Sequence, residues 1–321
     1  MEMRCECIQW MDFKSRMSLR ATSHTEKTLV ESSPKIHFDF VQVELDVDYE
    51  PSVIGMKDFE ETLLFKHKTL KTNLKFVQKA RHLVVQLLKF AIIDHFEFCD
   101  KFDYNDAPEF VSNAAPMQFK SLQLKIDNKN VIEKFLEKCE TIEKLVLNCP
   151  YRINISQFEL FRRVKTIQLK GLKLPLVPYQ LLKSWIHNDM ELGTTLQAHF
   201  EFQAPFGFFA AVMNDRAVSR TYTELRLSTD NPAKHILIRR VPDFEDWATE
   251  HFLSFHVISA DQNASEYEKN DQWVKNFKKE KLCRDVRQAK LAMEYLSIQI
   301  AHFEFRIKRI DEAGRWESDE E

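Results

Sequence analysis

Glycine is scarce in this chain, and its scarcity excludes several common functions. A chain of 321 residues usually contains about 22 glycines, whereas this one contains five. No two of them are close enough to build G-x-G-x-x-G or G-x-x-x-x-G-K-[ST], the loops whose backbone N–H groups bind phosphates. The sequence therefore excludes dinucleotide-binding and P-loop sites of these types. The five are Gly55, Gly171, Gly193, Gly207 and Gly314.

Cysteine, net charge and long apolar runs are also limited. Six irregularly spaced cysteines do not make a disulfide framework, and Cys5 and Cys7 lack the further nearby ligands of a metal site. We expect Cys99, Cys139 and Cys149 to be buried thiols. A net charge of −3 gives no bulk attraction to nucleic acid or to an anionic membrane. No apolar run reaches about 18 residues and the N-terminus has no apolar signal core, so we expect an intracellular protein.

Catalytic motifs are lacking as well. No G-x-S-x-G elbow, H-E-x-x-H helix or kinase signature occurs. His251 and His256 are five residues apart, which does not fit the i, i+4 spacing of metal-binding histidines on a helix. Asp189 and Glu191 follow a helix-like segment, where a solvated turn explains them better than an acidic pair. We identify no catalytic residue, cofactor or metal ligand and expect a non-catalytic protein. The alternative is an enzyme of unfamiliar type that uses loop Asp, Glu and His residues.

The sequence does contain a recurring triplet Φ-x-x-Φ-x-Φ, in which Φ is a large apolar residue. Successive copies start 26, 23, 22 and 58 residues apart, and a weaker copy around Leu196 lies midway in the last gap. Periods of about 20–29 residues with such a strand are typical of leucine-rich-repeat-like solenoids, which are usually binding proteins. The copies are Ile93/Phe96/Phe98, Phe119/Leu122/Leu124, Ile142/Leu145/Leu147, Val164/Ile167/Leu169 and Tyr222/Leu225/Leu227.

Helix-like segments lie between the triplets. Val131, Ile132, Phe135 and Leu136 share one helical face, and Pro178 suits the first turn of a helix that contains Leu181, Leu182, Trp185 and Ile186. Residues 77–88 carry another such stripe. One strand and one helix cannot bury their apolar faces alone, but stacked copies can. We therefore predict an α/β fold: a leucine-rich-repeat-like solenoid of short strands and helices, with a small helical N-terminal segment.

Three regions follow from these patterns. Residues 1–33 are a helical segment, residues 34–230 form the repeat-like domain, and residues 231–321 continue or cap that domain. Ile36–Leu45 is predicted to be a strand and Phe206–Met213 a buried helix. Two interpretations fit residues 286–310. Spacing by three and four predicts one long amphipathic helix, whereas β-branched and aromatic residues favour a helix to about Tyr295 and then a strand, which we expect.

The N-terminal residues bear a resemblance to a known family. Gln9-Trp-Met-Asp-Phe13, Met17–Ser32 and Phe40–Leu45 resemble the end of a nematode F-box. Leu181-Leu-Lys-Ser-Trp185-Ile-His is similar to part of the nematode F-box-associated domain, and Phe305–Asp311 to its closing strand. The resemblance implies a substrate-recognition subunit of a cullin-RING ubiquitin ligase, whose F-box binds a Skp-type adaptor while the repeats capture a target. It places the adaptor-binding residues at Met11, Phe13, Met17, Leu19, Leu29 and Val30.

The family's opening Leu-Pro motif and first helix are not present in this sequence, so we expect adaptor binding to be weak or lost. For the target, strand alternation puts a second set of side chains opposite the apolar triplets. These are mostly polar, and lysine and arginine outnumber the single Glu224, so we expect an acidic target. The predicted target-binding residues are Gln123, Lys125, Lys144, Val146, Gln168, Lys170 and Arg226.

Overall fold

The structure, a computed structural model, divides the chain into two compact units, Met1–Gln262 and Asn263–Glu321. It describes residues 11, 13–33, 35–46, 60–67, 70–77, 88–89, 91–100, 111, 116–126, 129–148, 159–201, 205–241, 250–263 and 272–318. The first unit contains a pair of helices and a large sheet with its own helices. The fold is therefore α/β, as predicted, and the two units divide after residue 262.

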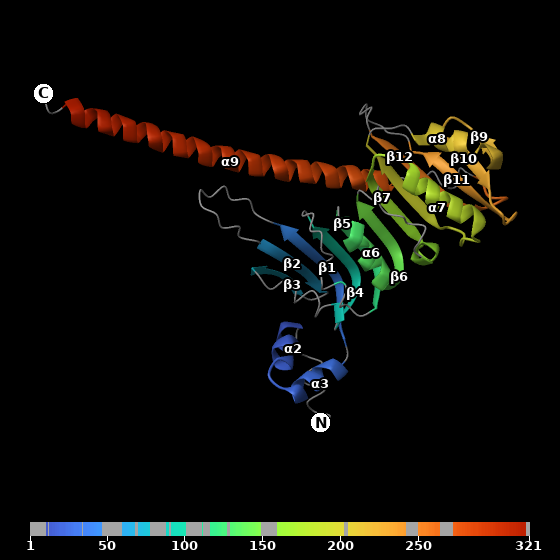
Figure 1. The fold of residues 1–321 in the computed structure, drawn as a ribbon, viewed down its shortest axis with the longest axis horizontal. Coiled ribbons are helices and arrows are strands. Elements are labelled where there is room, and N and C mark those ends of the chain that lie inside the picture. The colour runs from blue at the N-terminus through green and yellow to red at the C-terminus, as the bar shows by residue number, and fades with distance from the viewer. Residues whose placement is uncertain are drawn as a thin grey trace. The chain divides into compact units, whose positions relative to one another are not determined.

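A twelve-stranded mixed sheet dominates the described residues of the first unit (Figure 1). Six neighbouring strands, β1, β4, β5, β6, β7 and β8, run parallel and lie in chain order. Antiparallel strands extend both ends, in the order β3-β2 before β1 and β12-β11-β10-β9 after β8. The bounds are β1 Ile36–Asp46, β2 Glu60–His67, β3 Leu70–Val77, β4 Ala91–Asp100, β5 Met117–Ile126, β6 Cys139–Asn148, β7 Thr166–Leu172, β8 Thr195–Phe200, β9 Ala217–Arg220, β10 Glu224–Ser228, β11 Lys234–Arg240 and β12 His251–Ser259.

The apolar triplets place these strands in one core. The prediction that eight triplet residues are buried in one sheet is confirmed, since each has no exposed surface: Leu122, Leu124, Leu145, Leu147, Ile167, Leu169, Leu225 and Leu227. The last triplet is not equivalent to the others, however. Tyr222 is 81% exposed beside Arg240, and β10 is antiparallel to its neighbours. The weaker copy at Leu196 instead supplies the sixth parallel strand, β8.

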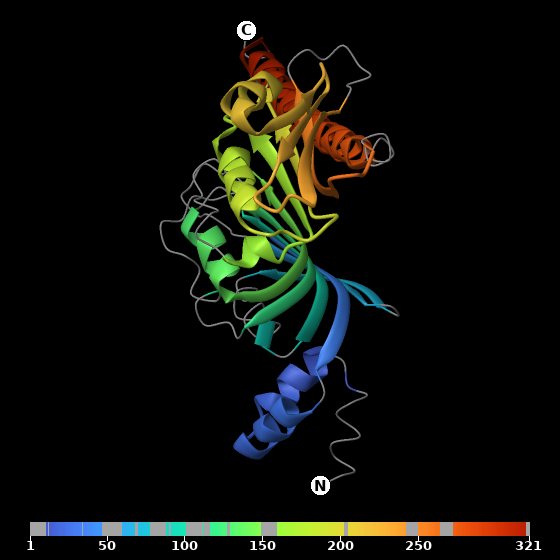
Figure 2. The same cartoon turned by 90° about the vertical axis from the view of Figure 1, so that its right-hand side faces the viewer.

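Three helices cover the triplet face of the sheet: α6 (Lys129–Lys138), α7 (Leu176–His187) and α8 (Pro205–Val212) (Figure 2). In α6 the predicted apolar face is buried. The ring centroid of Phe135 lies 6.0 Å from that of Phe96 and 5.3 Å from that of Phe98. In α7 the four predicted residues are buried, with Pro178 in the first turn. Phe209 of α8 packs edge-on against Phe255 of β12. Two short 3-10 helices, η2 (Glu159–Arg162) and η3 (Asn214–Arg216), complete this unit's connections.

The N-terminal segment forms two helices, α2 (Phe13–Arg20) and α3 (His24–Ser32). The hydroxyl of Ser23 caps α3 by accepting a hydrogen bond from the backbone N–H of Glu26 at 3.1 Å. An ion pair of 2.8 Å between Arg20 and Glu31 joins the two helices. Of the predicted helix over residues 77–88, Val77 ends β3, and residues 78–87 lie outside the described part of the chain.

The second unit contains the long helix α9 (Gln272–Ser318). Figure 1 shows it as one continuous helix, so the strand predicted after Tyr295 is wrong. The cause is the spacing of the apolar residues: Val286, Met293, Ile300 and Ile307 repeat every seven residues, which suits a helix, and this period outweighs local β propensity. Among the helices that the structure describes, none combines the length and the apolar character needed to span a membrane.

Candidate interaction surface

The face of the sheet opposite α6, α7 and α8 carries a continuous line of side chains, which we call the polar row. Its members are in register on neighbouring strands, so adjacent ones are about 5 Å apart. Apart from Val146 they are all polar. From β1 to β10 the polar row consists of Gln42, Glu97, Gln123, Val146, Gln168, Gln197, Ser254, Arg239 and Glu224.

One part of this face, over β4, β5 and β6, is accessible to solvent. His95 and Lys144 are exposed, and Ser121 lies between them in register. Of the predicted target-binding residues, Gln123 and Lys125 are half-buried here and Lys144 is exposed. We call this area the open patch, defined as His95, Glu97, Ser121, Gln123, Lys125 and Lys144.

The same face is enclosed over β7, β8, β12 and β11. Val146, Gln168 and Lys170 were predicted to be on the target-binding surface, but they are only 3%, 6% and 7% exposed. The prediction fails because alternation assigns a side chain to a face but does not say whether that face is exposed. Large apolar residues share this face with the polar ones. Phe252 lies opposite His199 and Leu237 lies opposite His256 on the neighbouring strands. Both Phe252 and Leu237 are 1% exposed.

Arg226 also has a structural role rather than a free surface position. Its guanidinium donates hydrogen bonds to the carbonyl oxygens of Ser259 and Gln262, both at 3.1 Å, and to that of Ala260. Its Nε donates to Nδ1 of His235 at 2.8 Å. These bonds hold the chain that follows β12 against β10, so the arginine is not available for a partner.

The predicted basic row is therefore not formed. Lys125 makes a cross-strand ion pair with Glu97, whose side chain is 14% exposed. Lys170 is buried, and Arg226 is bonded to carbonyl oxygens. Lys144 is the member of the predicted set that remains exposed, and it makes no ion pair with a described residue. The open patch thus presents both charge signs together with hydroxyl and amide groups.

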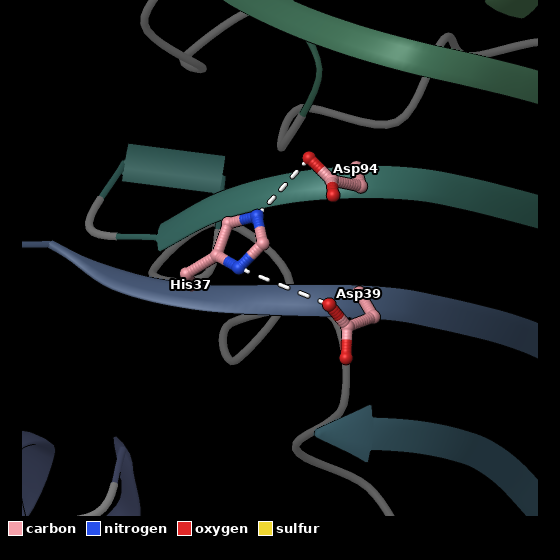
Figure 3. Close-up of side chains that lie close together, drawn as sticks. All are labelled: His37, Asp39 and Asp94. Carbon is pink, nitrogen blue, oxygen red and sulfur yellow. Dashed lines mark ion pairs between the residues drawn. The ribbon is translucent and has the colours of Figure 1, made fainter. Parts of the chain in front are cut away.

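A second polar cluster lies where β1, β4 and β5 begin to pair. Nε2 of His37 is 3.0 Å from Asp94, and Nδ1 of His37 is 3.9 Å from Asp39 (Figure 3). Lys120 pairs with the second oxygen of Asp94 at 2.8 Å. The hydrogen bond from Lys120 lowers the pKa of Asp94, and the same bond raises the pKa of Lys120. His37, Asp39 and Asp94 are close enough to share a metal ion, but the Lys120 ammonium already neutralises the central carboxylate.

A pocket of about 340 Å³ lies beyond the C-terminal end of α7, and its lining includes Asp189 and Asp230. Asp189 pairs with Lys234 at 2.7 Å and accepts a bond from Asn231. Asp230 contacts His187 and Arg216, both at 2.9 Å. The bond from Lys234 lowers the pKa of Asp189, and the contact with His187 lowers that of Asp230. Both carboxylates are therefore stable anions, and neither suits the role of a proton donor.

Asp189 is the one acidic residue of this pocket that the sequence singled out, and its partners are Lys234 and Asn231. Lys234, Asp230 and Arg216 come from a different part of the chain, 27 to 45 residues further on. No local spacing signals such pairs. The same holds for His37 and Asp94, which only strand pairing brings together.

The predicted adaptor-binding residues pack mainly against one another. Leu29 and Val30 are 7% and 5% exposed, and Met11, Met17 and Leu19 lie partly buried around them. The side chain of Phe13 lies outside the described residues. Leu29 and Val30, the two most apolar residues of α3, thus pack in the contact between α2 and α3. Leu29 and Val30 were predicted to face an adaptor, and their burial leaves them unavailable to it in this arrangement.

Comparisons with protein-family models, with curated proteins and with solved structures give no match to this chain.

Proposed function

We propose that this chain is a non-catalytic protein-interaction protein that captures a target protein on the open patch. The observation that carries this proposal is the division of the sheet into two faces. The helices α6, α7 and α8 pack apolar residues against one face, while the other face presents a solvent-accessible area of hydroxyl, amide and charged groups on rigid strands. Groups held on strands are better positioned for recognition than groups on loops, because the sheet fixes their separations.

We propose further that β4 to β8 are degenerate leucine-rich-repeat-like units. Their parallel order along the chain, the triplet on each strand and the intervening α6, η2 and α7 support this interpretation. In such an array each unit contacts its neighbours, and the strand face is the usual binding surface. The open patch occupies three consecutive units of that face.

The chemistry of the open patch suggests a target with a polar, mixed-charge surface. Lys144 offers a charge that could pair with a carboxylate, while Gln123 and Ser121 offer both donors and acceptors. Glu97 is already engaged with Lys125, so neither adds a free charge. A target recognised here therefore needs one acidic group near Lys144 rather than an extended acidic surface.

The second part of the proposal is that the chain is an F-box-type substrate-recognition subunit of a cullin-RING ubiquitin ligase, or a degenerate relative of one that has lost adaptor binding. The resemblance of residues 9–45 to a nematode F-box supports it. Leu29 and Val30 are buried between α2 and α3, so the apolar surface left for a Skp-type adaptor is small. We expect no saturable binding in titration calorimetry of the full chain with a purified Skp-type adaptor at about 10 µM, because losing interface anchors costs about 2 kcal/mol or more each. Stoichiometric binding at that concentration would contradict this expectation and favour a working ligase subunit over a degenerate relative.

Target capture is tested with matched surface variants. Wild type, Lys144→Glu and Lys183→Glu are immobilised in equal amounts, and the proteins retained from a cell extract are quantified by mass spectrometry. Lys183 is an equally charged, exposed residue on α7, on the helix-covered face. A protein retained by wild type and by Lys183→Glu but lost from Lys144→Glu supports the proposal. Equal retention by all three would exclude the open patch as the binding surface.

A further inference from the structure

The helix α9 exposes an apolar seam that runs along most of its length. Large apolar residues of the seam are between 54% and 69% exposed in a single chain. In a heptad labelled a to g, the a positions are Val286, Met293, Ile300 and Ile307. The d positions are Leu282, Ala289, Leu296, Phe303 and Ile310. The pattern holds for four heptads without a break, which is the length at which coiled-coil periodicity becomes diagnostic.

A single helix of this kind is not a stable end state in water. Isolated helices gain little from backbone hydrogen bonds alone, and most helical stability comes from burying an apolar face. From Leu282 to Asp311 the residues are exposed, except Gln299, which is half-exposed. A contiguous exposed apolar seam of this length indicates an interaction site. The seam therefore needs a partner that covers it.

The charges beside the seam indicate which partner this is. In a parallel, in-register pair of helices, each g residue faces the e residue of the following heptad on the other helix. This rule pairs Asp285 with Lys290 of a second copy, and Arg306 with Asp311 of a second copy. Both pairs join opposite charges, and symmetry makes each occur twice. None of these four side chains makes an ion pair with another described residue of its own chain.

The remaining flanking positions agree with this arrangement. Ala292 faces Ser297 and Gln299 faces Glu304, so no flanking pair joins like charges. Val or Ile occupies three of the four a positions and Leu two of the five d positions, and β-branched residues at a combined with Leu at d favour two strands. Residues 282–310 would give a coil about 43 Å long.

We propose that α9 is a dimerisation helix that pairs with α9 of a second copy as a parallel, in-register coiled coil over residues 282–310. Two copies then present two open patches on one molecule. A second, shorter apolar stripe of α9 lies at Leu291, Tyr295, Ile298 and Phe305 and is 50% to 62% exposed. His302 falls within it, and Arg309 ends it. The seam is longer and purely apolar, so it is the pairing face, and the shorter stripe provides matched control positions.

Sedimentation equilibrium of the full chain between about 1 and 100 µM tests the pairing. Wild type is expected at twice the 38.1 kDa chain mass. Ile300→Lys with Ile307→Lys places charge in the seam and is expected to give monomer. Leu291→Lys with Ile298→Lys makes the same change at equally exposed positions off the seam and is expected to remain a dimer. Monomeric wild type at 100 µM, or loss of the dimer only in the off-seam variant, would overturn the proposal.

Direction and register are tested separately. Leu282→Cys in a Cys283→Ser background places one thiol at a d position, so a parallel pair should form a disulfide-linked dimer on mild oxidation. The Cys283→Ser chain alone is the control for the other cysteines. An antiparallel pair would separate the two introduced thiols by the length of the coil and give no cross-link, which would contradict the proposed arrangement.

Charge reversal supplies a test that does not depend on apolar residues. Asp285→Lys opposes two positive charges in the parallel register and should weaken the dimer about tenfold. Adding Lys290→Asp to the same chain restores opposite charges and should recover most of that loss. Because both variants leave the seam intact, failure of the second change to restore affinity would show that Asp285 does not face Lys290 of the second copy.

Discussion

The two parts of the sheet's polar face are built from the same kind of residues but end in different environments. Over β4 to β6, His95 and Lys144 are exposed and the charges between strands are paired at the surface. Over β8 and β12, polar residues His199, Ser254 and His256 are each 2% to 3% exposed. The difference coincides with neighbours such as Phe252, which contacts the ring of His199 at 5.0 Å.

This difference separates recognition from stability. A polar residue in the open part exchanges water for a partner at little cost to the fold, because surface groups contribute little stability. A polar residue in the enclosed part must be satisfied within the protein, because an unpaired buried group costs stability. We therefore expect substitutions in the open part to change binding and substitutions in the enclosed part to change stability.

The greatest loss of stability is expected from a substitution on the buried side of β6. Leu145 and Lys144 are neighbours on β6 with side chains on opposite faces, and Leu145 has no exposed surface. Leu145→Ala should lower the free energy of unfolding by about 2–5 kcal/mol through the cavity that it leaves. Lys144→Ala should change it by less than about 0.5 kcal/mol. Urea denaturation of both variants checks this, and comparable losses would mean that β6 does not separate two faces.

Acid should act on the enclosed part of the face. Burial lowers the pKa of His256 to about 4, below the usual 6.5. The unfolded chain therefore binds the proton more readily, so stability falls as the pH drops from about 6.5 towards 4. The loss from this residue is about 3 kcal/mol. Thermal unfolding across this range, compared with His256→Gln, measures it. An unchanged pH dependence in the variant would show that another group is responsible.

Loss of an ion pair should also reduce stability more in the enclosed part of the face than in the open part. Arg239, which is 6% exposed, pairs with Glu224 at 3.1 Å. Glu224→Ala leaves a largely buried arginine with one partner fewer and should cost about 1–3 kcal/mol. Lys120→Ala removes the solvent-screened pair with Asp94 and should cost much less. Equal costs in chemical denaturation would remove the distinction between enclosed and open pairs.

The sequence predicts the apolar side of this sheet well because burial of large apolar residues leaves a periodic trace. Leu122, Leu145 and Ile167 repeat at a fixed place in each unit, and the structure buries all three. The sequence predicts the polar side of the sheet poorly. Period-two alternation shows which face a side chain lies on, but it does not show whether that face is exposed to solvent. Gln168 and Gln123 occupy equivalent positions in their strands, yet only Gln168 is buried.

Side-chain pairs between distant parts of the chain and the structure of the C-terminal region are also hard to predict from the sequence. His37 and Asp94 meet only because β1 pairs directly with β4, although β2 and β3 lie between them in the sequence. In α9, residues such as Ile298 and Phe305 favour a strand individually, but the regular spacing of the seam makes a helix the better structure. The heptad spacing is present in the sequence and predicts this helix better than local propensity does.

The smallest effect on stability should accompany the largest effect on binding. Lys144→Glu should change the free energy of unfolding by less than about 0.5 kcal/mol, because the side chain is exposed and makes no ion pair with a described residue. The same change reverses the free charge of the open patch and should slow association with an acidic site on a target. Once a target is identified, stopped-flow association at two salt concentrations measures this. An unchanged rate would place recognition elsewhere.

Site-specific photo-crosslinking tests most directly whether the open patch is the surface that captures a protein. A photoreactive amino acid replaces Lys144 in one chain and Lys183 in another, and both are irradiated in the same extract. We predict a discrete cross-linked protein from position 144 and none from position 183. A cross-link of equal yield at both positions, or at position 183 alone, would contradict the claim that the polar face of the sheet is the binding surface.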